Sequence, residues 1–260
     1  MRPSPTRPTI MPARAPEMVA IPILWGSVLL AATLAAVAAW LLGESGLGRV
    51  APEKADVMLM GVKLHDVTTA TVRAAELRSA VVIFASFGGV LGLATGLAGG
   101  LNRGSLRPAA LAALVGLVAG GAAGGLAPVG VLPAYHSLAS GGFPEPLTAL
   151  VAHAGIWAPI GAAAGLALGL GLGGRGRALR ALTGGVFGAL LGAVAFDVVG
   201  ALAFPLDETS RPVSTTALSR LVARLLAAVP SAAVALAAAS GRGAEYQRTA
   251  SERPPSSNPL

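Results

Sequence analysis

No charged side chain interrupts SAVVIFASFGGVLGLATGLAGGL (residues 79–101), and glycine recurs in it at every fourth position from Gly88 to Gly100. An α-helix needs about 20 mostly apolar residues to cross the hydrocarbon core of a bilayer, which is about 30 Å thick. This segment reaches that length. We therefore expect residues 79–101 to form a transmembrane helix.

The rest of the chain has a similar composition. Of its 260 residues, 54% are hydrophobic and 12% are charged, and the mean hydropathy is +0.70. A soluble domain carries about 25% charged residues, and so few charges could not cover so much apolar surface in water. The sequence therefore predicts an all-α fold, a polytopic membrane bundle of about six transmembrane helices. The predicted spans are residues 18–43, 79–101, 109–133, 148–172, 181–204 and 217–239.

The first of these spans has two interpretations. A cleaved signal peptide has an apolar region of about 7–15 residues, followed by small residues at the cleavage site. The apolar run here is longer, from Ile21 to Leu42, and Trp40 stands where a small residue would mark cleavage. We favour an uncleaved signal anchor over a cleaved leader.

Basic residues alternate between the two predicted sides of the bundle. Eleven of the 19 Lys and Arg residues lie on one side, in segments 1–17, 102–108, 173–180 and 240–260. Most of the basic residues on the other side lie in one long loop, where acids balance them. Since cytoplasmic segments collect Lys and Arg, both termini are expected to be cytoplasmic. The bias toward Ala, Gly and Arg is typical of a GC-rich bacterial genome, so we expect the bacterial inner membrane.

Three segments are expected outside the membrane. Residues 1–17 are rich in Pro and Arg and residues 240–260 in Ser and Pro, a composition typical of disorder. The external loop 44–78 is the only sizeable region between spans. Its part from Asp66 to Arg78 lacks Pro and Gly, so we expect a helix there that continues into the second span.

An internal repeat is visible at a constant offset of 73 residues. Residues 83–107 match residues 156–180 at 11 of 25 positions, including a glycine series and the Leu-Arg pair that follows each span. The match predicts a parallel repeat of a glycine-rich helical hairpin, related by an axis along the membrane normal. Parallel repeats occur in transporters. They also occur where the only task is to build a bundle.

The glycine series lie along single helix faces, because residues four apart share a face. Glycine lets helix backbones approach closely, and in lipid this packing replaces the hydrophobic drive that associates helices in water. The other interpretation is a pore or sliding interface lined by small residues. We favour packing, because glycine has no side chain with which to select a solute. The predicted packing glycines are Gly88, Gly92, Gly96, Gly100, Gly161, Gly165, Gly169 and Gly173.

Four ionisable residues fall inside the predicted spans, where they usually face the bundle interior. They are His153, Asp197, Arg220 and Arg224. At 1.5 Å per residue, all four lie about 5–11 Å from the external ends of their spans, so one polar cluster could contain them. We expect Asp197 and Arg224 to form an ion pair, since opposite charges reduce each other's desolvation cost. The cluster has three interpretations. It could tie the fifth and sixth helices together, its arginines could simply extend to the lipid headgroups, or it could be a functional site.

Other classes of site have little support in the sequence. The absence of cysteine excludes disulfides and thiolate metal ligands. The glycine pattern G-x-G-x-x-G at residues 171–176 closes a membrane span, whereas a dinucleotide site needs a strand before it. We expect no cofactor, no metal site and no catalytic residue.

The net charge of +7 is spread over short loops, which argues against nucleic acid as a partner. The expected partners are the lipid bilayer and, as an open alternative, a second copy or other membrane proteins.

Three segments carry a resemblance to known proteins: HAGIWAPIGAAAGLALGLGLGG (153–174), FDVVGALAFPL (196–206) and SRLVARLL (219–226). In these segments the chain resembles a family of uncharacterised, glycine-rich bacterial membrane proteins with about six helices. The resemblance covers roughly residues 80–230. It implies the multi-span architecture and no particular activity.

Three classes of function stay open at this point. The sequence favours a structural or accessory membrane component without catalysis. The alternative is a small-solute transporter or channel, which should have a cavity that reaches mid-membrane between the repeats. The third is an intramembrane enzyme using His153 and Asp197, which should place these two side chains within hydrogen-bond distance and open to lipid or water.

Overall fold

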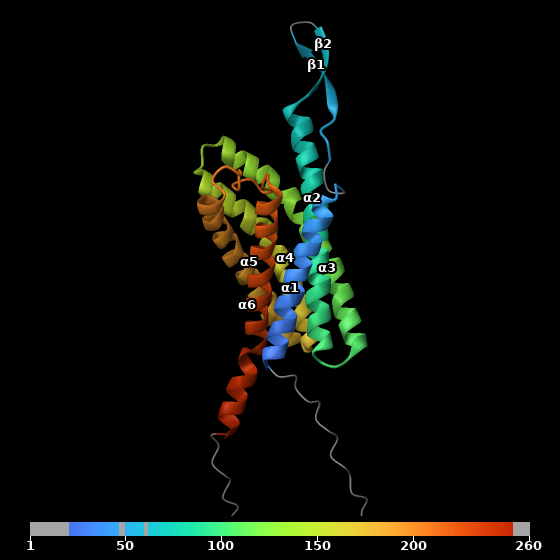
Figure 1. The fold of residues 1–260 in the computed structure, drawn as a ribbon, viewed down its shortest axis with the longest axis vertical. Coiled ribbons are helices and arrows are strands. Elements are labelled where there is room, and N and C mark those ends of the chain that lie inside the picture. Colours follow the sequence, from blue (N-terminus) through green and yellow to red (C-terminus); the bar gives the residue numbers. More distant parts are fainter. Residues whose placement is uncertain (1–20, 47–49, 60–61, 252–260) are drawn as a thin grey trace, which may run out of the picture.

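Six long helices pack side by side, and a β-hairpin stands beyond one end of the bundle (Figure 1). The computed structural model describes residues 21–46, 50–59 and 62–251, so the predicted disordered segment 1–17 lies outside the described residues. The elements are α1 (Ile21–Glu44), β1 (Lys54–Leu59), β2 (Val62–Val67), α2 (Thr69–Leu101), α3 (Leu106–Ser140), α4 (Glu145–Leu172), α5 (Arg175–Ala203) and α6 (Ala217–Ser251).

All six helices are long and apolar enough to cross a membrane. Their outer surfaces carry exposed leucines, among them Leu34, Leu114 and Leu191. Such a surface suits a bilayer, because lipid tails are as apolar as leucine. The predicted fold class is therefore confirmed as an all-α bundle of six membrane-spanning helices, the architecture of an integral membrane protein.

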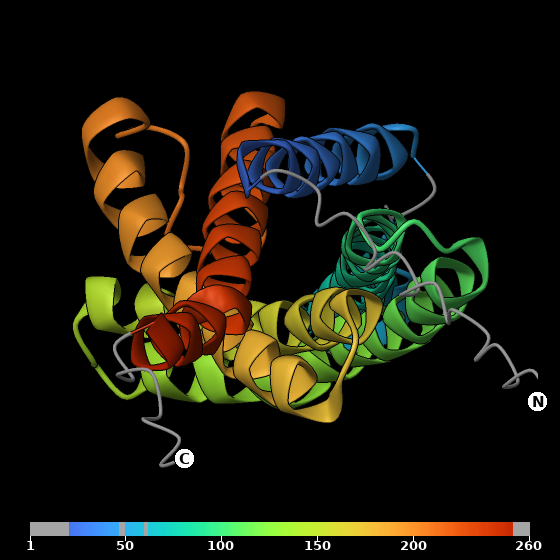
Figure 2. The same ribbon diagram turned by 90° about the horizontal axis from the view of Figure 1, so that it is seen from below.

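Helix α4 occupies the middle of the bundle. It packs against α2, α3, α5 and α6, and α1 closes the side between α2 and α6. Figure 2, seen from below, shows α1 alongside both of these partners. The hairpin end of the bundle also holds the turn 141–144 and the loop 204–216, and the opposite end holds the turns 102–105 and 173–174.

Several helices run past the predicted span limits. Hydropathy placed the end of the sixth span at residue 239, but α6 continues to Ser251. Residues 240–251, which the composition suggested are disordered, are therefore helical. The first proline after this point is Pro254, so no proline breaks the helix before Ser251. The remaining residues of the tail, 252–260, lie outside the described residues.

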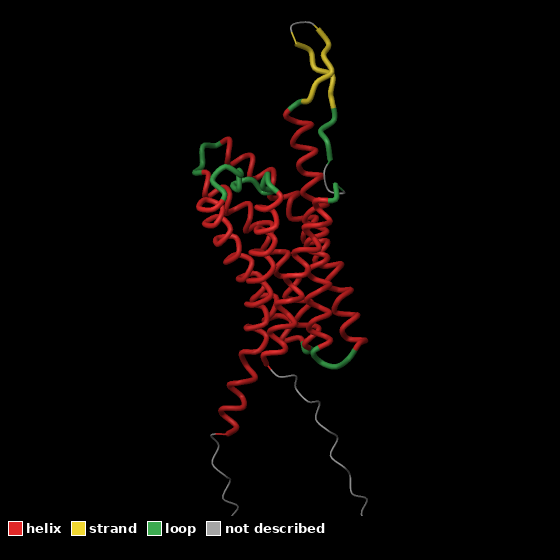
Figure 3. The backbone as a smooth tube through the Cα atoms, viewed as in Figure 1, coloured by secondary structure: helices red, strands yellow, loops and turns green. Residues whose placement is uncertain are grey.

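The segment 44–78, which was predicted to be an external loop, has more structure than expected. Strands β1 and β2 pair antiparallel, with Lys54 opposite Val67, and stand clear of the helices (Figure 3). The helix expected from Asp66 begins instead at Thr69, because Asp66 belongs to β2 and Thr68 caps the helix. The Thr71 amide donates to the Thr68 hydroxyl at 3.2 Å. From there α2 runs without a break into the membrane, as predicted.

Glycines bring the helices of each hairpin into backbone contact. An added Cβ at Gly92 would lie 2.6 Å from the carbonyl carbon of Gly116, and one at Gly165 would lie 2.7 Å from that of Ala181. Real Cβ atoms essentially never come this close to other atoms, so only glycine permits the approach. All eight predicted packing glycines make a contact of this kind, seven of them with backbone; Gly173 meets the Arg103 side chain instead.

The two helical hairpins also contact each other through small residues. Thr95 on α2 donates its hydroxyl to the Ala164 carbonyl on α4 at 3.0 Å. Nearby, an added Cβ at Gly99 would lie 2.6 Å from the Leu168 carbonyl oxygen, and one at Gly171 would lie 2.6 Å from the Gly100 nitrogen. The interface between α2 and α4 is thus closed by backbone contacts in its middle and at its far end.

The proposed duplication stays a prediction. Its constant offset pairs α2 with α4, and both take part in glycine-packed hairpins. However, Leu106 begins α3, whereas Leu179 lies beyond the first turn of α5. The shared Leu-Arg pairs therefore occupy different positions relative to the two turns.

Candidate functional site

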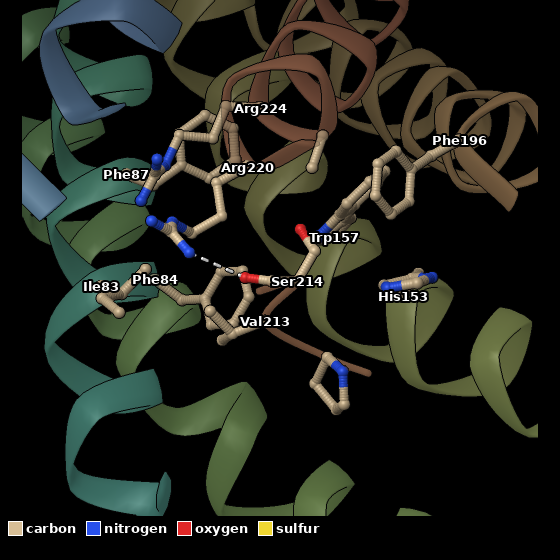
Figure 4. A pocket seen from close by; sticks show the side chains of 12 residues that line it. Ile83, Phe84, Phe87, His153, Trp157, Phe196, Val213, Ser214, Arg220 and Arg224 are labelled. Atoms are coloured by element: carbon tan, nitrogen blue, oxygen red, sulfur yellow. Dashed lines mark hydrogen bonds between the residues drawn. The ribbon is translucent and has the colours of Figure 1, made fainter. Parts of the chain in front are cut away.

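A small cavity lies inside the hairpin end of the bundle. It is lined by α2, α4, α5, α6 and the loop before α6, and three of the four ionisable residues singled out by the sequence face it (Figure 4). The space open to the centres of water molecules is about 30 Å³. A single water needs about 10–15 Å³ by this measure, so the cavity has room for two or three.

His153 on α4 forms one wall of this cavity, and only 1% of its surface is exposed. Its Nδ1 lies 2.7 Å from Asp197 Oδ1 on α5. Its Nε2 lies 3.2 Å from the Arg211 carbonyl oxygen in the loop before α6. His153 thus joins two helices and the loop through its two ring nitrogens.

The protonation of this pair follows from its acceptors. The Arg211 carbonyl can only accept, so Nε2 carries a proton. Nδ1 then either donates to a carboxylate, as part of an imidazolium, or accepts from a protonated Asp197. The pair has zero net charge in both cases. Neither ring nitrogen of His153 is left to take a proton from a substrate.

Aromatic rings hold His153 in place. Phe196 meets it edge to face at a centroid distance of 5.1 Å, and Trp157 lies 5.3 Å away, one turn further along α4. Phe196 and Trp157 also contact each other at 5.6 Å. Such pairs add to the stability gained from burial alone. The imidazole is therefore fixed by packing as well as by hydrogen bonds.

Arg220, near the start of α6, binds a carboxylate that the sequence did not single out. Its Nε and Nη2 donate to the two oxygens of Glu44, at 2.6 and 2.8 Å. Its Nη1 donates to the carbonyls of Ser214 and Thr215, at 3.0 and 2.6 Å. The bidentate pair joins the end of α1 to α6, and the other two bonds fix the loop that closes the cavity.

Arg224 lies one turn deeper on α6 and has a different environment. Its side chain is only 6% exposed, and Nη1 is buried without a hydrogen-bond partner in the described part of the chain. Its Nη2 lies against the backbone of Gly43 on α1. Glu44 and Arg220 act on its charge with opposite signs.

The structure brings the predicted cluster together with different pairs. His153, Arg220 and Arg224 line one cavity, and Asp197 is bound to His153 behind it. The expected Asp197–Arg224 ion pair is not formed among the described residues. Depth along a helix was the basis of that expectation, and depth does not determine the direction in which a side chain points: Arg224 points toward α1.

Residues that the sequence did not suggest complete the site. Phe84 and Phe87 of α2 form an apolar wall, and Ser214 lies in the loop above them. The described residues contain no group of three His, Asp or Glu side chains that could hold a metal ion. Comparison of the chain with protein-family models, with curated proteins and with solved structures gives no match.

Proposed function

We propose that this protein is a structural or accessory component of the bacterial inner membrane that neither transports solutes nor catalyses a reaction. The closed α2–α4 interface is the observation that carries this proposal. A transporter built on the two hairpins would need a path there, but the Thr95–Ala164 hydrogen bond and the backbone contacts of Gly99 occupy it. The cavity lined by His153, Arg220 and Arg224 has room for two or three waters.

A flux assay tests the transport part of the proposal. The purified protein is reconstituted into liposomes, and leakage of ions and small solutes is compared with that of protein-free liposomes. We expect no difference. A protein-dependent flux that saturates with solute concentration would overturn the proposal. As a control for leaks through loosened helices, Gly99→Leu should raise non-saturable leakage, because it forces α2 and α4 apart.

An accessory role also predicts a neighbour in the membrane. A photo-crosslinking residue at Met58, exposed on the hairpin, should join the chain to one discrete partner in native membranes. The same residue at Leu126, exposed on the outer surface of α3, is the matched control and should give lipid adducts only. A band that contains only this chain would indicate a homo-oligomer. No discrete product from any hairpin position would contradict the accessory role.

The enzyme alternative is favoured by one observation, the 2.7 Å contact between His153 and Asp197. A base oriented by a carboxylate is a common catalytic arrangement. Here, however, the second nitrogen is bound to the Arg211 carbonyl. Diethyl pyrocarbonate, which modifies free imidazole nitrogens, should therefore leave His153 intact and modify the exposed His65 of the hairpin. Equal modification of both would favour the catalytic interpretation.

A further inference from the structure

Two arginines and one carboxylate meet where α1 and α6 come together at the cavity. Glu44 gives both of its oxygens to Arg220, and no hydrogen bond or ion pair to Arg224 occurs within the described part of the chain. Figure 4 shows the two guanidinium groups close together beside Phe87. Two like charges held this closely in an apolar setting repel each other, and the shared carboxylate balances only one of them.

The other charged groups at the cavity do not supply the balance. His153 and Asp197 together carry no net charge, as their hydrogen bonds require. Of the described residues around the cavity, one positive charge on Arg224 is therefore left over. A charge buried in a membrane protein without a partner is strongly unfavourable. A ligand with one negative charge would remove this cost.

The shape and depth of the cavity indicate what kind of anion it would take. Arg224 lies about 10 Å along α6 from its first residue at 1.5 Å per residue, which places it in the half of the membrane on the hairpin side. The cavity admits two or three atoms of the size of oxygen, and its walls include the rings of Phe84, Phe87 and Trp157. It suits one anionic oxygen group attached to an apolar body.

We propose that Arg224 binds the phosphate of an anionic phospholipid from the leaflet on the hairpin side. A lipid phosphodiester carries a single negative charge, which equals the charge left over at Arg224. Two of its oxygens match the planar donors of a guanidinium. A free phosphate ion offers the same oxygens, so the test separates the two sources. The site is independent of the proposed function: a solute flux would refute that function without changing the lipid response.

Thermal unfolding in neutral detergent, free of phosphate, measures this binding. Added phosphatidylglycerol, an anionic phosphodiester lipid, should raise the melting temperature and saturate. Phosphatidylcholine, whose charge is already balanced, should have a much smaller effect. If inorganic phosphate alone produces the full rise, the ligand is the free ion. If neither phosphatidylglycerol nor phosphate raises the melting temperature, the proposal is overturned.

Variants show whether Arg224 carries the response. Arg224→Gln should raise the half-saturating lipid concentration at least about tenfold, in keeping with the loss of a charged hydrogen bond. Without lipid, this variant should melt no lower than the native protein, because it removes a buried unbalanced charge; a merely structural arginine would lose stability. Arg211→Gln, which removes an exposed charge from the same end of the bundle, should keep the native response.

Two outcomes for the variants would overturn the proposal. The first is an equal loss of lipid response in Arg224→Gln and Arg211→Gln, which would indicate attraction by surface charge in general. The second is an unchanged response in Arg224→Gln. If Arg224→Gln does not fold, Arg224→Lys serves in its place: it keeps the charge but loses the paired donors, so it should respond to lipid with weaker affinity.

Discussion

Replacing Gly92 with alanine tests whether α2 and α3 pack backbone against backbone. An added Cβ would lie 2.6 Å from the carbonyl carbon of Gly116 and 3.0 Å from its Cα. An ordinary carbon–carbon contact is about 3.5–4.0 Å. Because the opposing atoms are main chain, no rotamer change relieves the overlap. The two helices would have to separate by about 1 Å.

The magnitude follows from two terms. Overpacking of this kind costs about 1–3 kcal/mol. Alanine is better than glycine inside a helix by about 0.5–1 kcal/mol, which offsets part of that cost. Gly130 on α3 is the matched control, since an added Cβ there has nothing within 4 Å. Both variants gain the same helix propensity from alanine, so the difference between their free energies of unfolding gives the steric cost alone. We expect Gly92→Ala to be less stable than Gly130→Ala by about 1–3 kcal/mol.

The free energy of unfolding can be measured by titrating the protein in mixed micelles with dodecyl sulfate and following helix content by circular dichroism. Gly116→Ala offers a second test from the opposite helix, because its added Cβ would meet the Gly92 carbonyl. If Gly92→Ala proves as stable as Gly130→Ala, the helices are not in backbone contact and the reasoning fails.

Two further predictions concern the polar pair and the orientation. His153→Ala and Asp197→Ala should each lower the free energy of unfolding by about 1–3 kcal/mol, since each leaves a buried or partly buried partner unpaired. The double variant should lose clearly less than the sum, and strict additivity in the same titration would show that the pair does not form. Because the chain has no cysteine, an impermeant maleimide on intact cells should label Lys63→Cys in the hairpin and reach Gly176→Cys, in the turn region at the opposite end, only after the membrane is opened. The reverse pattern would overturn the prediction that both termini are cytoplasmic.

Hydropathy was sufficient to locate all six helices, because each span must be apolar over the thickness of the bilayer. It was insufficient for the segment between the first two. The residues of KADVML and VKLHDV partly alternate between polar and apolar, which favours two strands. The pair between the two runs, Met-Gly, is not one that favours a tight hairpin turn, so the alternation alone does not separate two strands from an irregular loop.

The contents of the polar cavity were predictable, but its pairings were not. His153, Arg220 and Arg224 meet because their depths agree, and depth can be counted along the sequence. Which of them pair with carboxylates depends on how each helix is rotated about its axis. It also depends on Glu44, the last residue of α1, which was predicted to belong to the loop. One sequence contains no information on how six helices are turned relative to each other.

Because α2 runs without a break from the β-hairpin into the bundle, a force on the hairpin acts on this helix over a long distance. The helix has no proline between Thr69 and Leu101, so it bends little along its length. Its close backbone contact with α3 begins where Phe84 meets Gly124, about 22 Å below the first turn at 1.5 Å per residue. Phe84, where this contact begins, is also part of the cavity wall. A sideways load on the hairpin would be carried down α2, first to the contact of Glu76 with His136 on α3, 3.1 Å apart, and then to Phe84 at the cavity wall.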